Sequence, residues 1–383
     1  MKWEEVKIKD IAVVKKGSYI TKKEANLGPY PVILGGKEPA YYIDKYNHQG
    51  KAIVISRSGA SAGFVSFWNE DIFVTDGFLV EPIGDVSYEY MYYLLKSKQD
   101  ILQILQGGSA IPHVTPTIIY SICVNLPPKD VRERIGKVLK SYDDLIENNQ
   151  KQIKLLEEAA QRLYKEWFVD LRFPGHEDVE IVDGLPKGWE RTTIGKYISV
   201  RSGYAFKSDW WQKDGYPVVK IKDITKNTID LSELDYVGTD KLKKASEFKL
   251  NKHDLVIAMT GATIGKIGLV PEVDDLYANQ RVGKLFLKDC IANKTGFFFC
   301  YYTQSKVLEE ILAVSSSSSA QPNISGKQLE SFEVVANEEF IDMFNDLVEP
   351  YLDKINILRK QIFILKEARD CLLPKLMSGE VEV

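Results

Sequence analysis

The longest uninterrupted amphipathic stretch of the chain runs from Asp130 to Phe168, and it contains neither Gly nor Pro after Gly136. Its apolar residues recur at spacings of three and four, which predicts one apolar face along a continuous helix. Such a helix spans on the order of 60 Å at ~1.5 Å per residue. Because a single globular domain rarely contains a helix of this length, we expect the stretch to separate other parts of the chain.

A second stretch of the same kind runs from Phe340 to Leu376. Both patterns lie near the coiled-coil spacing, so each predicts a helix that packs against a partner helix. We expect the second helix to fold back antiparallel on the first and to bury both apolar seams. The seams are predicted to contain Tyr142, Leu145, Ile153, Leu156, Leu163 and Trp167 in the first helix, and Tyr351, Ile355, Leu358, Ile362, Leu365 and Leu372 in the second.

The segments that precede the two helices are copies of one another. Trp3-Glu4, Gly17 and Tyr30-Pro31-Val32 recur as Trp189-Glu190, Gly203 and Tyr216-Pro217-Val218. AIVISRSGASAG (residues 52–63) recurs as DLVIAMTGATIG (254–265), and GGSAIPHVT (107–115) recurs as SSSAQPNIS (317–325). The repeat is too long for a solenoid, so it indicates a duplicated unit of one domain and one long helix.

Each copy reads as a mixed α/β domain, because short strand-like runs alternate with Gly and Pro around one helical stretch, at residues 88–105 and 295–313. The predicted fold class is therefore α/β (α+β), with two similar mixed domains separated by two long antiparallel coiled-coil helices in a pseudo-two-fold, circular organisation. The predicted boundaries are 1–128 for the first domain, 129–170 for the first helix, 171–186 for a linker, 187–336 for the second domain, and 337–383 for the second helix and tail. A two-fold arrangement of two readers suits two half-sites on a DNA duplex.

Composition excludes some classes of protein without selecting one. The formal net charge of −4 argues mildly against nucleic-acid binding, since such proteins normally carry a basic footprint. The first ten residues show no signal-peptide pattern, and no apolar run reaches the length of a membrane span. Four scattered cysteines suit a reducing cytosol, so we expect a cytoplasmic protein. The four His and four Cys show no metal-ligand spacing, so no metal site is expected.

Three further motifs complete the pattern of the repeat. YKEWFVDLRFPG (residues 164–175) closes the first helix, LLPKLMSGEV (372–381) closes the second, and LPKGWE (185–190) opens the second domain. In this order and spacing, and with the turns SGASAG and TGATIG, the chain resembles the specificity (S, or HsdS) subunit of Type I restriction–modification systems over essentially its whole length. The resemblance rests on the combination, because each motif alone is weak.

The resemblance implies a DNA-binding subunit without catalytic activity. Each copy is then a target recognition domain that reads one half of a split sequence in double-stranded DNA, and the helices fix the gap. Two modification (methyltransferase) subunits, which bind S-adenosylmethionine, are expected to dock on the helices. Restriction subunits, added to that complex, are expected to cleave DNA with ATP and Mg. No cofactor is expected on this chain itself.

Two segments resemble catalytic motifs, but neither has the residues that the activity needs. Gly59-Ala60-Ser61-Ala62-Gly63 spells the G-x-S-x-G elbow of hydrolases, but the duplicate keeps the glycines, at Gly261 and Gly265, and replaces the serine by Thr263. The copies therefore share a glycine-dependent turn rather than a nucleophile. Residues 125–128, NLPP, resemble the N-P-P motif of adenine methyltransferases, but Leu126 interrupts it. We therefore expect neither activity in this chain.

DNA reading needs polar side chains on loops that reach the grooves and the phosphates. The candidates lie beside the two repeated turns, in the two repeated Gly/Ser-rich loops and on one strand face of the second copy. Asp76 is taken as the approximate counterpart of Asn279. The candidates are Arg57, Ser58, Ser61, Asp76, Ser109, His113, Thr115, Lys220, Lys222, Thr260, Thr263, Asn279, Gln280, Arg281, Ser319, Gln321 and Asn323.

Two alternatives remain open at this point. Beside the Type I specificity subunit, these are a specificity subunit of a related Type II restriction–modification enzyme and an assembly scaffold that reads no DNA. A scaffold explains the helices but does not explain two similar yet divergent domains beside them. For the lysines and for the serine run, a solvated surface is an alternative to DNA contact.

Overall fold

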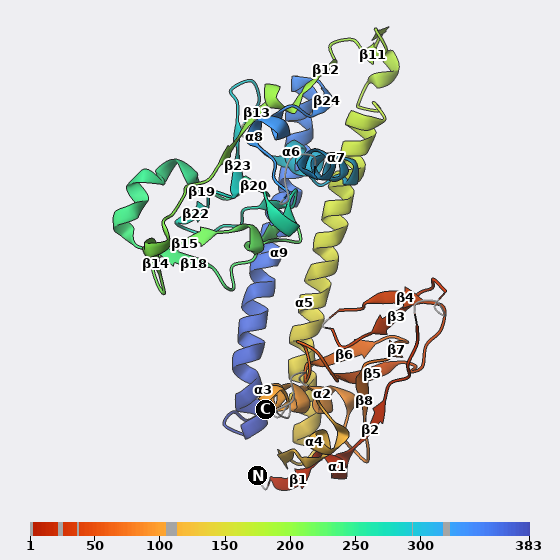
Figure 1. Ribbon diagram of the computed structural model, residues 1–383. Coiled ribbons are helices and arrows are strands. Elements are labelled where there is room, and N and C mark those ends of the chain that lie inside the picture. Colours follow the sequence, from red (N-terminus) through yellow and green to blue (C-terminus); the bar gives the residue numbers. More distant parts are fainter. Residues whose placement is uncertain (1–2, 22–25, 37, 105–112, 293, 317–321) are drawn as a thin grey trace. The chain divides into compact units, whose positions relative to one another are not determined.

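The computed structural model of the protein describes residues 3–21, 26–36, 38–104, 113–292, 294–316 and 322–383 (Figure 1). The chain forms two compact units. Unit 1 comprises Met1–Glu147 and Phe363–Val383, and unit 2 comprises Asn148–Ile362. Each unit therefore contains one of the two copies together with part of both long helices.

The described part of unit 1 contains three small sheets. The largest is antiparallel, in the order β2-β8-β5-β6, and is formed by Ala12–Lys16, Gly77–Pro82, Lys51–Ser56 and Val65–Asn69. The second has the order β4-β3-β7, from Tyr41–Ile43, Tyr30–Ile33 and Phe73–Val74, and its β3–β7 pair is parallel. The third pairs β1 (Glu4–Lys7) with β9 (Cys123–Leu126).

Strand β5 shows why these sheets form a layered core. It is apolar from Ala52 to Ile55, and successive side chains of a strand point to opposite faces. Ile53 and Ile55 join the core that contains helix α2 (Tyr88–Lys96). Ala52 and Val54 join a separate cluster with residues of β3 and β7. A strand buried on both faces needs a continuous apolar run, and this explains the absence of alternation in its sequence.

The remaining helices of unit 1 are short. They are α1 (Ile8–Ile11), α3 (Gln99–Ile104) and α4 (Pro116–Ser121). Helix α1 separates β1 from β2, and the side chain of Asp10 accepts a hydrogen bond from the Lys7 amide at the start of its helical turn. The helix predicted for residues 88–105 is two helices, because α2 ends at Lys96 and the next residue, Ser97, is a C-cap whose hydroxyl donates to the Leu94 carbonyl.

Unit 2 repeats this plan with additions. A six-stranded sheet has the order β13-β23-β20-β21-β17-β16, from Ile198–Ser202, Val282–Leu287, Leu255–Ala258, Ile267–Leu269, Thr228–Ile229 and Ile224–Thr225. A five-stranded sheet has the order β14-β18-β15-β22-β19, from Trp211–Gln212, Asp235–Val237, Tyr216–Val219, Leu276–Ala278 and Lys249–Leu250. Two pairs join β12 (Glu190–Thr193) to β24 (Glu333–Ala336) and β10 (Ile181–Val182) to β11 (Leu185–Pro186).

The strand orders confirm the duplication. The order β13-β23-β20-β21 corresponds to β2-β8-β5-β6, and β18-β15-β22, with its parallel β15–β22 pair, corresponds to β4-β3-β7. Strands β14, β16, β17 and β19 have no counterpart in the described part of unit 1. Strands β16 and β17 lie between Val218 and Asp254, which are 36 positions apart, whereas the matched Val32 and Ala52 are 20 positions apart. The helices of unit 2 outside the long pair are α6 (Gly296–Tyr302), α7 (Ser305–Ser316) and α8 (Gly326–Glu330).

The two long helices are α5 (Lys129–Tyr164), which continues as a π-helical turn at Lys165–Val169, and α9 (Glu338–Ser378). Within unit 2, the Asn149 side-chain amide nitrogen of α5 donates to the Gln361 side-chain oxygen of α9 at 3.2 Å, and Glu157 of α5 pairs with Arg359 of α9 at 2.9 Å. Higher positions in α5 meet lower positions in α9, so the pair is antiparallel, as predicted. In unit 1, Asp143 of α5 is ion-paired with Arg369 of α9.

The seam between the helices follows the predicted spacing, with one correction. Ile355 and Leu358 are fully or almost fully buried, as is Leu352, and Trp167 is 5% exposed. Leu145, predicted in the seam, is 50% exposed, whereas its neighbour Ile146 is 6% exposed. The sequence offers two adjacent apolar residues there. Steps of four and three through Ile146 and steps of three and four through Leu145 fit the helical repeat equally well, so packing places Ile146 in the seam. Tyr142, Ile153, Leu156, Leu163, Tyr351, Ile362, Leu365 and Leu372 are partly buried.

Candidate nucleic-acid interface

The two repeated turns have the same backbone structure. Gly59 and Gly63 have φ of 80° and 81°, and Gly261 and Gly265 have φ of 75° and 80°. The Gly63 amide donates to the Ser56 carbonyl at 2.9 Å, and the Gly265 amide donates to the Ala258 carbonyl at 2.8 Å. Only glycine adopts these backbone angles without strain. The shared feature is therefore the turn, and the Thr263 hydroxyl in the second copy donates to the Ile221 carbonyl at 3.2 Å.

Each turn aligns three neighbouring segments into a small site. In unit 1, the Arg57 amide donates to the Asp76 carbonyl at 3.2 Å, the Val114 amide donates to the Arg57 carbonyl at 2.9 Å, and Ser58 forms a β-bridge with His113. In unit 2, the same bonds join Met259 to Arg281 and Ile324 to Met259, both at 3.0 Å, and Thr260 bridges Asn323. Four positions therefore correspond. They are Arg57, Ser58, Asp76 and His113 in the first copy, and Met259, Thr260, Arg281 and Asn323 in the second.

In the first copy, the four side chains form one polar network, which we call the unit 1 reading site. Arg57 Nε donates to His113 Nε2 at 3.2 Å and lies 3.7 Å from Asp76 Oδ1. The Ser58 hydroxyl donates to the other oxygen of Asp76. The side chains of Arg57 and Asp76 are 30% and 27% exposed, so the network reaches the surface.

The second copy has different chemistry at the matched positions, which form the unit 2 reading site. Met259 is 4% exposed, and its sulfur accepts a hydrogen bond from the Ser202 hydroxyl at 3.6 Å. Arg281 and Asn323 are exposed, and the buried Thr260 hydroxyl has no hydrogen-bond partner among the described residues. The arginine of the unit 2 reading site is thus Arg281, on the segment after β22, whereas that of the unit 1 reading site is Arg57, on the segment after β5.

The structure corrects the approximate equivalence of Asp76 and Asn279. The Thr75 amide donates to Ile33, and the Asn279 amide donates to Val219 in the matched strand, so Asn279 corresponds to Thr75. The matched residues Gly17 and Gly203 donate their amides to Gly77 and Val282, so these two residues correspond. Thr75 and Gly77 are two positions apart, whereas Asn279 and Val282 are three positions apart. The second copy therefore carries one additional residue here. Asn279 is 9% exposed and sits inside the sheet, while Gln280 beside it is exposed.

Several other candidates have local structural roles. The Thr115 side chain caps helix α4 by accepting from the Ile118 amide at 3.3 Å. Lys220 and Lys222 both pair with Asp235, at 2.9 and 3.4 Å, and the Lys220 ammonium lies 3.7 Å from the centre of the Trp211 ring. Ser61 is half-buried within its turn. Ser109, Ser319 and Gln321 lie outside the described residues. The convergent candidates are thus those at the matched positions.

The long helices expose apolar side chains that the sequence analysis missed. In unit 2, Leu155 of α5 is 64% exposed, and Met343, Leu347 and Ile357 of α9 are 40%, 50% and 52% exposed. These residues lie off the seam, because the seam is filled by other apolar side chains such as Phe344, Val348 and Leu352. The signal in the sequence is an apolar residue on a face that the helix pair does not need.

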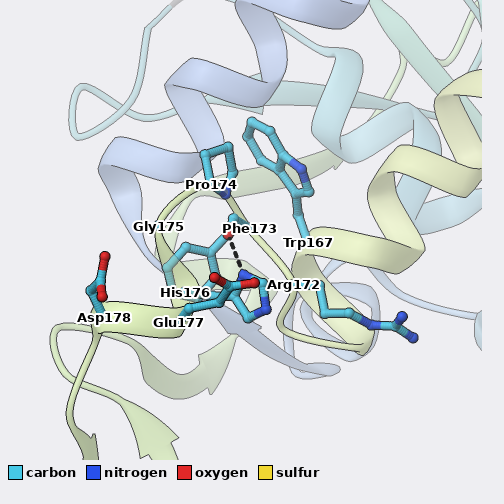
Figure 2. Close-up of a pocket in the computed structure, with 8 residues that line it drawn as sticks. All are labelled: Trp167, Arg172, Phe173, Pro174, Gly175, His176, Glu177 and Asp178. Carbon is cyan, nitrogen blue, oxygen red and sulfur yellow. Dashed lines mark hydrogen bonds between the residues drawn. The ribbon is translucent and has the colours of Figure 1, made fainter.

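A pocket of about 400 Å³ lies at the end of α5. Figure 2 shows its lining residues, which are Trp167, Arg172, Phe173, Pro174, Gly175, His176, Glu177 and Asp178. His176 Nδ1 is hydrogen-bonded to the Phe173 carbonyl at 2.9 Å, and Phe173 stacks on Trp189. Trp167 is held by edge contacts with Phe340 and Phe344. The pocket therefore results from the packing of aromatic side chains where the helix meets the domain.

Other classes of site find little support. No group of three or more His, Cys, Asp and Glu side chains in the described part of the chain is placed to hold a metal ion. Among the described helices, none is both long enough and apolar enough to span a membrane. Two similar α/β domains, two long antiparallel helices and a polar site on each domain define a class of protein with two recognition modules and helical connectors.

The comparisons identify the family within that class. The profile of the family "Type I restriction modification DNA specificity domain" matches residues 1–158 and 186–335. The chain belongs to this family of DNA specificity domains, and it contains two copies of the domain.

Relatives and a solved structure agree with this assignment. The chain is 28% identical to the Type I restriction enzyme MjaIX specificity subunit of Methanocaldococcus jannaschii, over 100% of this chain and 94% of the relative. It is 24% identical to the MjaVIII specificity subunit of the same organism, over 93% and 92% of the two chains. The fold matches the S subunit of a Type I restriction–modification system from M. genitalium with a TM-score of 0.65, at 20% identity, over 98% and 96% of the two chains.

Proposed function

We propose that this chain is the DNA specificity subunit of a Type I restriction–modification complex and that its two copies read the two halves of a split sequence in double-stranded DNA. The observation that carries the proposal is the pair of matched reading sites, in which the same backbone frame presents Arg, Ser, Asp and His in one copy and Met, Thr, Arg and Asn in the other. A scaffold has no need for a constant frame with divergent side chains. A reader of two different half-sites needs such a frame.

We assign residues 1–128 and 187–336 to the two target recognition domains, residues 129–170 and 337–383 to the spacing helices, and residues 171–186 to the linker. A hydrogen bond and two ion pairs between the antiparallel helices α5 and α9 support a helix pair that fixes the spacing between the half-sites. B-DNA advances ~34 Å per turn, and a helix of this length spans on the order of 60 Å at ~1.5 Å per residue, which is why the gap between the half-sites is assigned to the helices.

The partners follow from the same proposal. Two modification subunits dock on the apolar side chains that α5 and α9 expose beside their seam, and restriction subunits join that complex. S-adenosylmethionine, ATP and Mg belong to these partners, and this chain contributes recognition without catalysis. The protein acts in the cytoplasm, where it meets DNA. The proposal of a related Type II enzyme is not favoured, because the relatives named above are Type I subunits.

The acidic charge of the chain is consistent with a shared DNA interface. With a net charge of −4, the chain alone provides little of the phosphate neutralisation that dominates DNA affinity. The modification subunits then supply much of that contact. We expect the isolated chain to bind DNA weakly and the assembled complex to bind it tightly. Equal sequence-specific affinity of the chain alone and of the complex, measured by titration at one salt concentration, would contradict this division.

The decisive experiment is methylation-sensitive sequencing of a host that expresses the chain with its modification subunit. A split methylated motif is expected. Exchange of residues 1–128 for those of a relative should change one half of the motif and leave the other half and the gap unchanged. A scaffold would leave the motif the same after the exchange. A matched control is the exchange of residues 187–336, which should change the other half.

A further inference from the structure

Arg57 is placed with more precision than an ordinary surface arginine. It follows directly on the buried strand β5, which ends at Ser56. Its amide donates to the Asp76 carbonyl at 3.2 Å, and its carbonyl accepts from the Val114 amide at 2.9 Å. Backbone hydrogen bonds thus hold Arg57 between the segments that contain Asp76 and Val114. A side chain on such a rigid frame retains its position when a ligand approaches.

The guanidinium of Arg57 is oriented by two groups on those neighbours. Its Nε donates to His113 Nε2 at 3.2 Å and lies 3.7 Å from Asp76 Oδ1. Because arginine has no acceptor, His113 accepts through an unprotonated Nε2. The Asp76 carboxylate is itself held by the Ser58 hydroxyl. Within the described part of the chain, neither terminal nitrogen of Arg57 has a hydrogen-bond partner, and the side chain is 30% exposed.

This arrangement leaves the outer edge of the guanidinium with two parallel donor groups. The fork matches the O6 and N7 acceptors on the major-groove edge of guanine, and no other base presents two acceptors there. A phosphate contact needs only positive charge on a mobile stem, for which a lysine without orienting partners suffices. A carboxylate and an imidazole that fix the direction of the fork favour base reading over phosphate binding.

We propose that Arg57 is the specificity-determining residue that reads a guanine in the half-site of the first copy, and that Asp76 and His113 are positioning residues that aim its guanidinium. The inference rests on the proposed function, because it assumes that the first copy faces one DNA half-site. It adds a named base and a named residue to that function.

The second copy provides an internal contrast. Met259 holds the matched position, is 4% exposed and offers no donor to a base. The requirement for guanine at this position therefore applies to the half-site of the first copy alone. The half-site of the second copy is read from the exposed Arg281 and Asn323, so its base at the matched position is set by other groups.

The test uses the chain together with its modification subunit, with Arg57→Ala, Arg57→Lys and Asp76→Asn as variants. The half-site of the first copy is the one that changes when residues 1–128 are exchanged. Arg57→Ala and Arg57→Lys should both relax one G·C pair of that half in the methylated motif. Asp76→Asn should relax the same pair more weakly. Arg134→Ala, which removes an exposed arginine of unit 1 that pairs with Asp130 on its own helix, is the matched control and should leave the motif intact.

Binding by the purified complex gives a second readout. Replacement of the guanine should weaken wild-type binding roughly tenfold to a hundredfold, whereas the Arg57→Ala complex should bind both duplexes about equally. Thermal melting of Arg57→Lys, which retains charge and length, separates a reading defect from a folding defect.

The outcomes distinguish this inference from the function on which it rests. A split motif that Arg57→Ala leaves fully specific would show that Arg57 reads no base and would overturn the inference alone. Relaxation at an A·T pair, or uniform weakening on all duplexes, would do the same. A wild-type complex that methylates no split motif would overturn the proposed function and the inference with it.

Discussion

Met259 occupies in the second copy the backbone position that Arg57 occupies in the first. The backbone amide of each residue donates to the segment that follows β7 or β22, the strand in a parallel pair. The backbone carbonyl of each accepts from the segment that precedes the short helix α4 or α8. The two side chains nevertheless have opposite environments, since that of Arg57 is 30% exposed and Met259 is 4% exposed. Duplication has preserved the frame, while the side chains within it have diverged in both chemistry and direction.

Met259→Arg should therefore fail to transplant the reading group. The Met259 sulfur accepts a hydrogen bond from the Ser202 hydroxyl and would lie 2.8 Å from a Cβ added at Gly283. A guanidinium in this place would therefore be buried without a carboxylate partner. We expect a loss of about 3 kcal/mol in the free energy of unfolding, because an unpaired buried charge is costly. Urea denaturation of the chain would measure it. Met259→Leu, which conserves volume, should cost less than about 1.5 kcal/mol, and an equal loss in both variants would contradict the argument.

Arg359→Met should destabilise unit 2 through the partner it leaves behind. Arg359 pairs with Glu157 at 2.9 Å, and the two side chains are 12% and 21% exposed. Burial raises the pKa of Glu157 despite the attraction of Arg359, and burial lowers the pKa of Arg359 to about 10. Removing the cation leaves a buried carboxylate, so we expect a loss of about 3 kcal/mol at neutral pH. The double variant Glu157→Leu, Arg359→Met should recover most of that loss.

The same pair has a pH dependence of known sign. A carboxyl group whose pKa is raised by folding binds its proton more tightly in the folded state, so the folded state gains stability as pH falls through that pKa. Loss of Arg359 raises the pKa of Glu157 further. The deficit of Arg359→Met should thus be largest at neutral pH and shrink as the solution is acidified, in urea titrations against wild type. A deficit that grows on acidification would refute the account.

How far the sequence predicts this structure depends on the kind of signal. The spacing of the apolar residues predicted the two long helices and their antiparallel packing, because many residues share one period. It did not distinguish Leu145 from Ile146, since adjacent apolar residues fit nearly the same period and packing decides between them. The repeat located Arg57, Ser58, Thr260 and Arg281 near the turns. It did not pair Asp76 with Arg281, because a single extra residue before Val282 shifts the alignment and only backbone hydrogen bonds reveal it.

Gly17→Ala should destabilise unit 1 for a steric reason. A Cβ at Gly17 would lie 2.5 Å from the Val74 carbonyl oxygen and 2.7 Å from that of Thr75. These backbone atoms belong to the segment that leads to Asp76, so the chain would have to shift beside the reading site. We expect a loss of about 2 kcal/mol in the free energy of unfolding, as for other overpacked positions. Gly36→Ala is the control, because its nearest neighbour is 3.5 Å away. Equal melting temperatures of the two variants would rule out the steric account.

Leu347→Glu and Ile357→Glu should separate assembly from folding. Both residues lie on α9, where they are 50% and 52% exposed, so a carboxylate at either position remains solvated in the isolated chain. A docked modification subunit would bury that carboxylate without a partner, and such burial costs several kcal/mol. We therefore expect normal melting temperatures together with loss of the complex with the modification subunit on size-exclusion chromatography. Ile181→Glu, at a residue 63% exposed in the connector between the copies, is the matched control and should assemble normally. Full assembly of both helix variants would show that the modification subunits dock on a different surface.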